Sequence, residues 1–394
     1  MKTNSFQPIR IEREDFTGRD HYPGTAGHPI NIINVLNQIV EKLPAPLYSV
    51  IFGGILHLIS QDRAMALIYV GFVFFDWLLL VLLPKFHISY GPPTLTLTIL
   101  ALLRLPFWLF RFPLAITFQG LGTLLVIYAF YLEPQRPKLE RYQVSIINAP
   151  HRQNSFKIVH LSDLHMAYFS QREEKIIQMV NAIDPDLILF TGDFFNLSNQ
   201  YDPQTIRDIT SFFSQLKAKY GKFAVTGSPA VDTPESLASL PKDLPITILQ
   251  NESQIVDLEG IAIRLTGVSC SHQPDDDFEV LKSVLAAEEA ETDASILLYH
   301  SPDLAPAAAT LPIDLQLSGH THGGQVQLPL IGPIFTGTLY GLKFISGAYF
   351  VNQHLRLIIS RGLGLEGNAA PRVRFLAPPE VGLITLEFCR DNVK

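Results

Sequence analysis

Short apolar runs that end at polar residues recur through the last two thirds of the chain. Four of them have the length of a strand and stop within two residues of an Asp or a His. They are Phe156–Leu161, Leu187–Thr191, Ile296–Tyr299 and Leu315–Ser318. We expect each run to form a strand and to deliver the residues that follow it to one place.

Helical stretches separate these strands, which predicts a mixed α/β domain over residues 142–394. The expected helices are Gln171–Ile183, Pro203–Lys219 and Phe278–Ala287. Further strands are expected at Tyr142–Ile147, Ile261–Thr266, Leu355–Ser360 and Val381–Phe388. At about 250 residues the domain is large enough to bury its own core. The acidic cluster Asp275–Asp277 is expected to be a solvated turn.

The first third of the chain is strongly apolar. Ala64–Leu83 is interrupted only by Asp76, and Pro113–Leu132 contains Gln119 as its one strongly polar residue. Both runs are about as long as a membrane span. Two shorter apolar runs are Leu47–Ser60 and Thr94–Phe110. We expect residues 46–132 to form a helical transmembrane domain of about four spans.

The two shorter runs also suit buried helices of a soluble core. Residues 46–132 offer no polar face, however, which favours the membrane. Asp76 and Arg104 are costly in lipid, so they are expected to pair or to face the interior of the bundle. Their role is helix packing or, as the alternative, contact with a substrate.

Residues 1–45 form a polar, partly disordered lead without the apolar core of a signal peptide. A charged, proline-rich linker follows the spans at 133–141. Basic residues flank the spans on both sides: Lys2, Arg10, Arg13, Arg19 and Lys42 before them, Arg136, Lys138 and Arg141 after them. Because such residues favour the cytoplasm, we expect a multi-pass plasma (inner) membrane protein with a cytoplasmic C-terminal domain.

Composition agrees with this assignment. The 394 residues are 47% hydrophobic and only 17% charged, which is low in charge for a soluble protein. The net charge of −7 and the lack of a basic stripe exclude nucleic acid as the expected partner. Cys270 and Cys389 are far apart and form neither a disulfide framework nor a cysteine metal motif.

Six residues of the types that bind metal follow the four strands: Asp163, His165, Asp193, His300, His320 and His322. Residues i and i+2 of an extended segment share a side, so each Asp-x-His or His-x-His pair can point into one cleft. Two divalent cations about 3.5–4 Å apart promote hydrolysis of phosphate esters. Asp193 is expected to bridge them, and imidazoles favour Mn, Fe, Zn or Ni over Ca.

The same segments, in order, resemble the signature blocks of the calcineurin-like metallophosphoesterases. They are Asp163-Leu-His165, Gly192-Asp193, His300 and Gly319-His-Thr-His-Gly-Gly324. The resemblance covers about residues 142–388 and is strongest to the bacterial subgroup with YkuE-like and UDP-2,3-diacylglucosamine hydrolase-like proteins. Its characteristic ending is matched by Ser360-Arg-Gly-Leu-Gly and Pro378-Pro-Glu.

This resemblance implies a four-layer αββα sandwich with two divalent metal ions. By the family pattern, one metal would be held by Asp163, His165, Asp193 and His322. The other would be held by Asp193, His300 and His320.

One family block is altered. The family carries Gly-Asn-His-Asp or Gly-Asn-His-Glu after its third strand, where Asn binds the second metal and His faces the leaving group. Here Gly227 is followed by Ser228-Pro229-Ala230. Ser228 could supply a weak oxygen ligand, and Asp232, Asn251 or water are the alternatives.

Each of these residues also has a simpler interpretation. A single Asp or His after a strand is more often a turn residue or a helix cap, but several blocks in family order favour a metal site. Arg361 is a candidate phosphate contact or a turn-stabilising residue. The remaining candidates are expected to be surface, packing or capping residues: His151, His160, His272, His354 and Asn196.

Two functions follow. The first is a membrane-anchored, divalent-metal-dependent hydrolase that cleaves a phosphodiester or pyrophosphate bond, with a lipid-linked molecule as the expected substrate. The second is a catalytically degenerate member of the fold that binds metal or a lipid headgroup as a sensor or scaffold.

Overall fold

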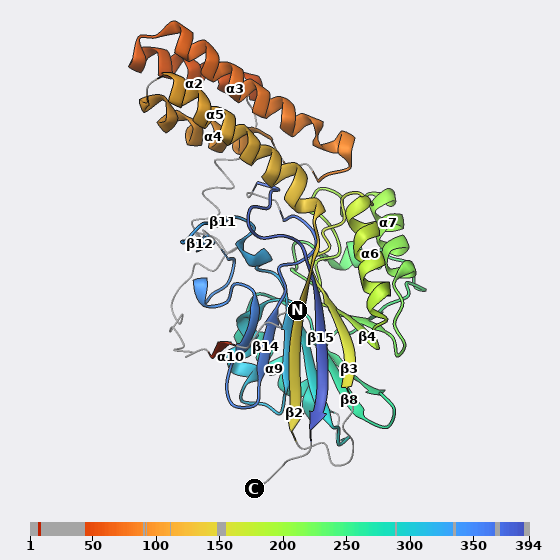
Figure 1. Ribbon diagram of the computed structural model, residues 1–394. Helices are drawn as coiled ribbons and strands as arrows, with labels where there is room; N and C mark the ends of the chain where they lie inside the picture. The colour runs from red at the N-terminus through yellow and green to blue at the C-terminus, as the bar shows by residue number, and fades with distance from the viewer. Residues whose placement is uncertain are drawn as a thin grey trace. The chain divides into compact units, whose positions relative to one another are not determined.

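The computed structural model describes residues 7–8, 44–89, 91, 93–110, 112–147, 155–287, 290–333, 336–366 and 371–389. The chain divides into two compact units (Figure 1). One is an α/β unit that contains 135–365 and 376–394, and the other is a helical unit that contains 16–134 and 366–375. The predicted polar lead at 1–45 lies almost entirely outside the described residues, as does His151.

The α/β unit contains two large sheets. The first has six strands in the order β2-β15-β3-β4-β5-β6. Their bounds are Lys138–Ile147, Glu380–Cys389, Ser155–Leu161, Leu187–Phe190, Lys222–Ala224 and Thr247–Ile248. The first strand, β2, therefore begins inside the predicted linker, two residues after a short 3-10 turn at Glu133–Gln135.

The second sheet has seven strands in the order β1-β13-β14-β10-β9-β8-β7. Their bounds are Gln7–Pro8, Gly347–Phe350, Arg356–Ile359, Leu315–Ser318, Ala294–Tyr299, Ala262–Val268 and Glu252–Asp257. A separate hairpin pairs β11 with β12, at Gln327–Leu328 and Gly332–Pro333. These sheets confirm the predicted mixed α/β fold.

Alternate side chains of one strand enter different cores, which explains the uninterrupted apolar runs. In β4, Leu187 and Leu189 belong to the core shared by both sheets, whereas Ile188 and Phe190 belong to the core beneath α6 and α7. These helices span Gln171–Ile183 and Pro203–Gln215 and lie beside β3 and β4 in Figure 1. The second sheet likewise packs its outer face against α9, Pro274–Ala286.

The acidic cluster Asp275–Asp277 is not a solvated turn, contrary to the sequence-based expectation. It forms the first turn of α9, where carboxylates are favoured by the partial positive charge of the helix N-terminus. Asp277 is buried and accepts hydrogen bonds from Ser271 N at 2.9 Å and from the Tyr299 hydroxyl at 2.5 Å. The cluster therefore ties the start of α9 to β9.

The helical unit contains four main helices, which lie side by side in Figure 1. They are α2 Ala45–Ser60, α3 Arg63–Leu82, α4 Pro93–Arg104 and α5 Phe112–Ile127. Short 3-10 or π segments extend three of them: Leu83–Phe86, Leu105–Leu109 and Tyr128–Leu132. Among the described residues, only Arg63–Phe86 and Phe112–Gln135 are long and apolar enough to cross a membrane. The expected first and third spans are shorter, so four spans remain a prediction.

Arg104 is the centre of a buried polar network in this unit. Its Nε and Nη2 atoms donate to the two carboxylate oxygens of Asp76 at 2.6 and 2.7 Å. Nη1 donates to the backbone and side-chain oxygens of Gln119, and Nη2 also donates to Thr123. All five guanidinium protons thus have acceptors, which supports helix packing as the role of the Asp76–Arg104 pair.

A segment from the C-terminal part of the chain completes the helical unit. Arg374 N donates to Ala129 O at 3.2 Å, and the Phe375 ring packs edge-on against Tyr128 with centroids 6.0 Å apart. The guanidinium of Arg372 donates to Ser89 Oγ. This return to the helical unit was not predicted, because nothing in the sequence of residues 371–375 resembles a helix of the bundle.

Candidate metal centre

The candidate ligands occupy tight turns at the carboxyl ends of neighbouring strands. Five of them have positive φ angles although none is glycine: Asp163 at 50°, His165 at 40°, Asp193 at 59°, His320 at 68° and His322 at 50°. Non-glycine residues rarely adopt this conformation, and it concentrates at functional sites. The strained turns rotate the side chains away from the strands and toward one another.

Gly227 allows the turns after β4 and β5 to approach each other closely. A Cβ atom at this position would lie 2.1 Å from both the backbone nitrogen and Oδ1 of Asp193. No other residue fits without moving the Asp193 turn. The same contact lets the next residue, Ser228, donate its backbone N–H to Asp193 Oδ1 at 2.7 Å.

Asp163, His165 and His322 form the first buried cluster able to hold a metal ion. His322 Nε2 lies 3.5 Å from Asp163 Oδ1 and 3.1 Å from His165 Nε2. The backbone N–H of His320 also donates to Asp163 Oδ1 at 2.9 Å, which ties the turn after β10 to the turn after β3.

Asp163, Asp193 and His300 form a second such cluster. Asp193 Oδ2 lies 3.3 Å from His300 Nε2 and 3.4 Å from His165 Nε2. Asp193 therefore contacts a member of each cluster, while Asp163 belongs to both. The sequence analysis assigned the shared position to Asp193 alone.

Backbone carbonyls set the orientation of two imidazoles. His165 Nδ1 lies 3.1 Å from Phe195 O, and His300 Nδ1 lies 2.7 Å from Thr191 O. A carbonyl oxygen only accepts hydrogen bonds, so Nδ1 carries the proton in each ring. In the neutral rings both Nε2 atoms then present lone pairs to the centre, as metal-binding histidines do.

These residues fit divalent cations. Asp163 Oδ2 is buried and accepts no hydrogen bond from the described residues. Carboxylate oxygens lie 3.3–3.5 Å from imidazole nitrogens, and two imidazole nitrogens lie 3.1 Å apart. Lone pairs this close repel one another unless a proton or a cation lies between them. A set of imidazole and carboxylate donors suits transition metals such as Mn, Fe, Zn or Ni.

The pKa shifts of these buried groups follow from the same concentration of negative charge. Burial raises the pKa of Asp163 to about 6. Burial acts in the same direction on Asp193, but His300 and His165 together lower the pKa of Asp193 below its ordinary value. Burial would lower the pKa of His300, yet Asp193 raises it well above the usual range. The buried carboxylates thus draw cationic charge into the centre.

His320 lies beside these clusters rather than within them. Its ring packs against His300 with centroids 5.1 Å apart, and its Nε2 lies 3.2 Å from Gly337 O. With Nε2 donating to that carbonyl, Nδ1 is the nitrogen that carries the lone pair. Burial, reinforced by His272 and His300, lowers the pKa of His320 well below its ordinary value, so the ring stays neutral as a ligand must.

The comparisons with known proteins agree with this geometry. The family model described as calcineurin-like phosphoesterase matches residues 156–324. The uncharacterized metallophosphoesterase YkuE of Bacillus subtilis is 34% identical over 267 residues, which cover 66% of this chain and 89% of that protein. The chain belongs to the calcineurin-like phosphoesterase family.

Two further relatives in this family have more informative names. The UDP-2,3-diacylglucosamine pyrophosphatase LpxG of Chlamydia trachomatis is 24% identical, covering 66% of this chain and 92% of that protein. The transmembrane protein with metallophosphoesterase domain of Bos taurus is 29% identical, covering 62% of this chain and 56% of that protein. The family membership confirms the predicted resemblance, while the ligand roles of individual residues remain predictions.

Ser228 occupies the position of the family asparagine in the altered block. Its hydroxyl lies 3.1 Å from His300 Nε2, so the side chain points into the centre. Asp232 does not replace the missing ligand, because its carboxylate accepts backbone hydrogen bonds from Asp193, Phe194 and Gly227. Asn251 is exposed, and its Oδ1 accepts a hydrogen bond from Ser269 N.

Asp232 instead fixes the turns that form the centre. Burial, together with the charge of Asp193, raises the pKa of its carboxyl to about 7 even though backbone amides donate to it. This supporting role of Asp232 could not be predicted, because the sequence does not show which backbone amides an Asp in a loop will bind.

His272 lies next to the candidate ligand His320. It follows β8 and was expected to be a surface or packing histidine, and its ring packs against that of His320 with the centroids 4.8 Å apart. Its backbone is strained, with φ at 61°, and its Nδ1 lies 3.6 Å from Cys270 Sγ. The family pattern places no residue here, so only the fold could reveal it.

Arg361 is held by acidic partners. Its Nη2 donates to Glu140 at 2.8 Å, and its Nε lies 3.4 Å from Glu380 Oε2 and donates to Pro378 O. These contacts support the turn-stabilising interpretation. A phosphate contact by Arg361 remains a prediction.

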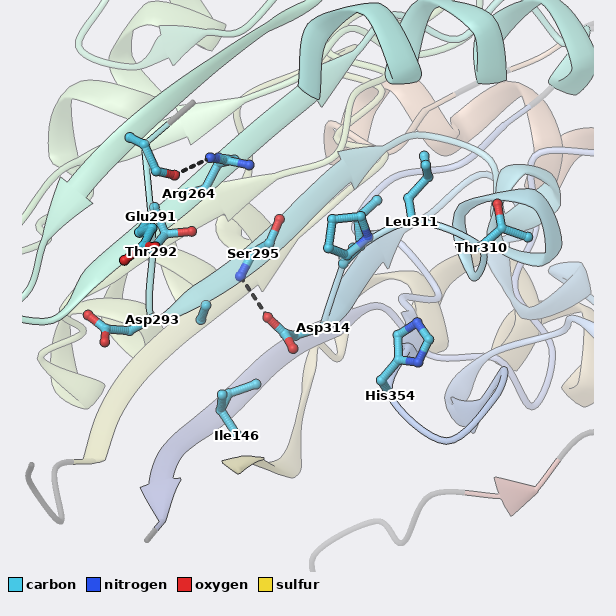
Figure 2. A pocket seen from close by; sticks show the side chains of 14 residues that line it. Ile146, Arg264, Glu291, Thr292, Asp293, Ser295, Thr310, Leu311, Asp314 and His354 are labelled. Atoms are coloured by element: carbon cyan, nitrogen blue, oxygen red, sulfur yellow. Dashed lines mark hydrogen bonds between the residues drawn. The ribbon is translucent and has the colours of Figure 1, made fainter. Parts of the chain in front are cut away.

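A cavity of about 960 Å³ lies where β9 and β10 begin (Figure 2). The candidate metal centre lies at the opposite ends of these strands. Its polar groups already hold the strands: Asp314 accepts from Ser295 N at 2.8 Å, and Asp293 accepts from Ala262 N at 2.8 Å. His354 lines its rim. The cavity therefore has no part in the candidate metal centre.

Proposed function

We propose that the chain is a membrane-anchored, metal-dependent phosphoesterase that cleaves a phosphodiester or pyrophosphate bond, with a lipid-linked substrate. One observation supports this most strongly. Asp163, His165 and His322 form one buried group of possible ligands, and Asp163, Asp193 and His300 form a second, with the ligand atoms of each group within 4.8 Å of one another. Nothing in the packing of the fold requires so many donors at one point.

The proposed ligands are Asp163, His165, Asp193, His300, His320 and His322, with Ser228 as a weak seventh. Bound divalent metals would supply a hydroxide nucleophile near neutral pH and offset charge on the phosphoryl oxygens. The protein holds the ligand set rigid: Phe195 O and Thr191 O fix two imidazoles, and Asp232 fixes the turn of Asp193. Such supporting contacts govern metal affinity and orientation.

The altered block favours a substrate with a good leaving group. No His follows Gly227, so the residue that faces the leaving group in the family is absent from this position. A positioned acid is worth about 10²–10⁴ in rate, mostly for leaving groups that must be protonated. A pyrophosphate releases a phosphate monoester that needs little protonation. The name of the LpxG relative, a UDP-2,3-diacylglucosamine pyrophosphatase, supports the same class of bond.

The proposed location is the plasma (inner) membrane, with about four spans in residues 46–132 and the α/β unit in the cytoplasm. The two spanning-length helices and the basic residues on both flanks support this topology. A reporter fused to the C-terminus should be active in the cytoplasm only. Activity outside the cytoplasm would reverse the orientation and require an odd number of spans.

The altered block also supports a second candidate, a metal- or headgroup-binding protein without turnover. Turnover of the purified full chain distinguishes the two. Hydrolysis of an aryl phosphodiester and of a nucleoside diphosphate sugar is measured with Mn²⁺, using Asp193→Asn as the control. Hydrolysis that Asp193→Asn abolishes supports the enzyme, whereas bound metal with no hydrolysis of either compound supports the sensor or scaffold.

A further inference from the structure

The β11–β12 hairpin exposes a continuous apolar tip. Leu328, Leu330 and Ile331 are 37%, 108% and 72% exposed, and Pro329 between them is exposed as well. Elsewhere in the described part of the α/β unit, the exposed large apolar residues outside this hairpin are scattered along the chain: Tyr201, Ile255, Leu342, Phe350 and Leu376. The hairpin is therefore a local concentration of apolar surface.

The backbone of the tip makes this choice of residues more unusual. Leu330 has φ at 68°, a left-handed conformation that Gly or Asn adopts easily and that disfavours leucine. A leucine does not lower the backbone strain of this turn, and its side chain is not buried here. An exposed apolar residue in a strained backbone conformation does not stabilise the fold, which indicates that it serves a function instead.

The hairpin is attached to the metal centre. It begins five residues after His322, and Gln327 Nε2 donates to Gly323 O at 2.9 Å. The segment after the hairpin returns to the same place, where Gly337 O lies 3.2 Å from His320 Nε2. A binding partner of the hairpin tip would therefore lie near the candidate metal ligands.

The sequence of this region suits lipid better than another protein. No Asp, Glu, Lys or Arg occurs between His322 and Lys343. A stable protein interface buries about 800 Å² on each partner, which three side chains at a hairpin tip do not provide. Insertion of a few apolar side chains into a bilayer surface needs no such area, and the chain's two spanning-length helices would keep a bilayer close.

We propose that the tip at Leu328–Ile331 inserts into the surface of a lipid bilayer and so holds the metal centre at the lipid headgroups. This inference rests on the proposed function, because it assumes a membrane-attached phosphoesterase acting on lipid-linked molecules. The inference adds to that function the surface, at Leu328–Ile331, that would bring the metal centre to its substrate.

Fluorescence quenching in vesicles tests the insertion directly. The full chain with Leu330→Cys is labelled with an environment-sensitive dye and reconstituted with lipids that carry a quencher in their acyl chains. The matched control is Glu259→Cys, an exposed position in the turn before β8, at the end of that strand opposite the metal centre. The unsubstituted chain, which retains Cys270 and Cys389, gives the labelling background.

We expect the dye at position 330 to be quenched severalfold more than the dye at 259 in vesicles without substrate. Equal quenching at the two positions would overturn the proposal, as would energy transfer between labelled copies in place of quenching. Absence of quenching until a lipid-linked substrate is added would also overturn it, because the tip would then bind the substrate's acyl chain rather than the bilayer.

Leu330→Asn supplies a second test that does not depend on labelling. Asparagine tolerates positive φ, so the variant should fold. We expect hydrolysis of a substrate embedded in vesicles to fall about tenfold, the scale set by one buried leucine side chain, while hydrolysis of a soluble aryl diester stays unchanged. An unchanged ratio of the two rates would overturn the proposal. If the proposed hydrolase is wrong, soluble hydrolysis is absent from all variants while the quenching result still stands.

Discussion

The carboxylate of Asp232 accepts a hydrogen bond from the backbone N–H of Asp193 at 2.8 Å. The same carboxylate accepts from Gly227 N, also at 2.8 Å. One buried side chain therefore joins the turn that presents Asp193 to the turn that presents Ser228. The position of the candidate bridging ligand depends on a residue that is not itself a ligand.

Replacing Asp232 by Asn should damage the centre without removing a ligand. The amide offers one oxygen in place of two, and its NH₂ group would face backbone donors. We expect the free energy of unfolding to fall by about 1–3 kcal/mol and metal affinity to fall about 10–100-fold. Urea denaturation and metal titration measure both quantities. The exposed substitution Asp243→Asn is the control, and an effect of equal size there would contradict this role.

Restoring the family block should change the choice of leaving group. Ser228 Oγ already lies 3.1 Å from His300 Nε2, so Asn at this position would place an amide oxygen near the second cluster. With Pro229→His added, we expect hydrolysis of an alkyl phosphodiester to rise about a hundredfold, with a much smaller change for an aryl diester. The ratio of kcat/KM for the two compounds is the measurement. A ratio that stays at the wild-type value would count against the assignment of this block.

His272 is expected to contact the substrate from the loop after β8. Its ring packs against that of His320 at 4.8 Å, and its N–H could support a leaving group in place of the missing family histidine. His272→Ala should lower kcat about tenfold or more for an alkyl diester and less for an aryl diester. His272→Gln, which retains an N–H donor, should recover part of the loss. Equal losses in both variants with both compounds would instead indicate a purely structural residue.

His160 should give the α/β unit a specific sensitivity to acid. His160 is buried, and its Nε2 is hydrogen-bonded to Thr191 Oγ1 at 2.9 Å. Burial lowers the pKa of His160 from 6.5 to about 3. Between these values the unfolded chain binds the proton more readily, so stability must fall as the pH falls from about 6.5 toward 3. His160→Gln should reduce this slope. Unfolding of the wild type and of His160→Gln at a series of pH values tests it, and identical slopes would disprove it.

The strands and their terminal ligands could be predicted because both signals are local. Leu187–Thr191, for example, is an uninterrupted apolar run that becomes β4, and Asp193 follows it within one turn. The helix Gln171–Ile183 was also predicted at its observed bounds, and in the structure Ser170 and Glu173 form a capping box at its start.

The positions of His272 and Asp232 beside the candidate ligands could not be predicted, because each depends on contacts between loops far apart in sequence. The run Asp275–Asp277 was misassigned as a turn because three consecutive carboxylates suit a helix N-terminus as well as a loop. The return of residues 366–375 to the helical unit leaves no periodic pattern at all.

The central claim is that Asp163 and Asp193 organise a two-metal centre, and the metal content of the purified full chain tests it most directly. Elemental mass spectrometry should find about two transition-metal ions per wild-type chain. Because Asp163 belongs to both clusters, Asp163→Ala should retain one ion or fewer, and Asp193→Ala should also lose metal, while the exposed control Asp243→Ala keeps the wild-type content. Full metal content in Asp163→Ala and Asp193→Ala would contradict the account.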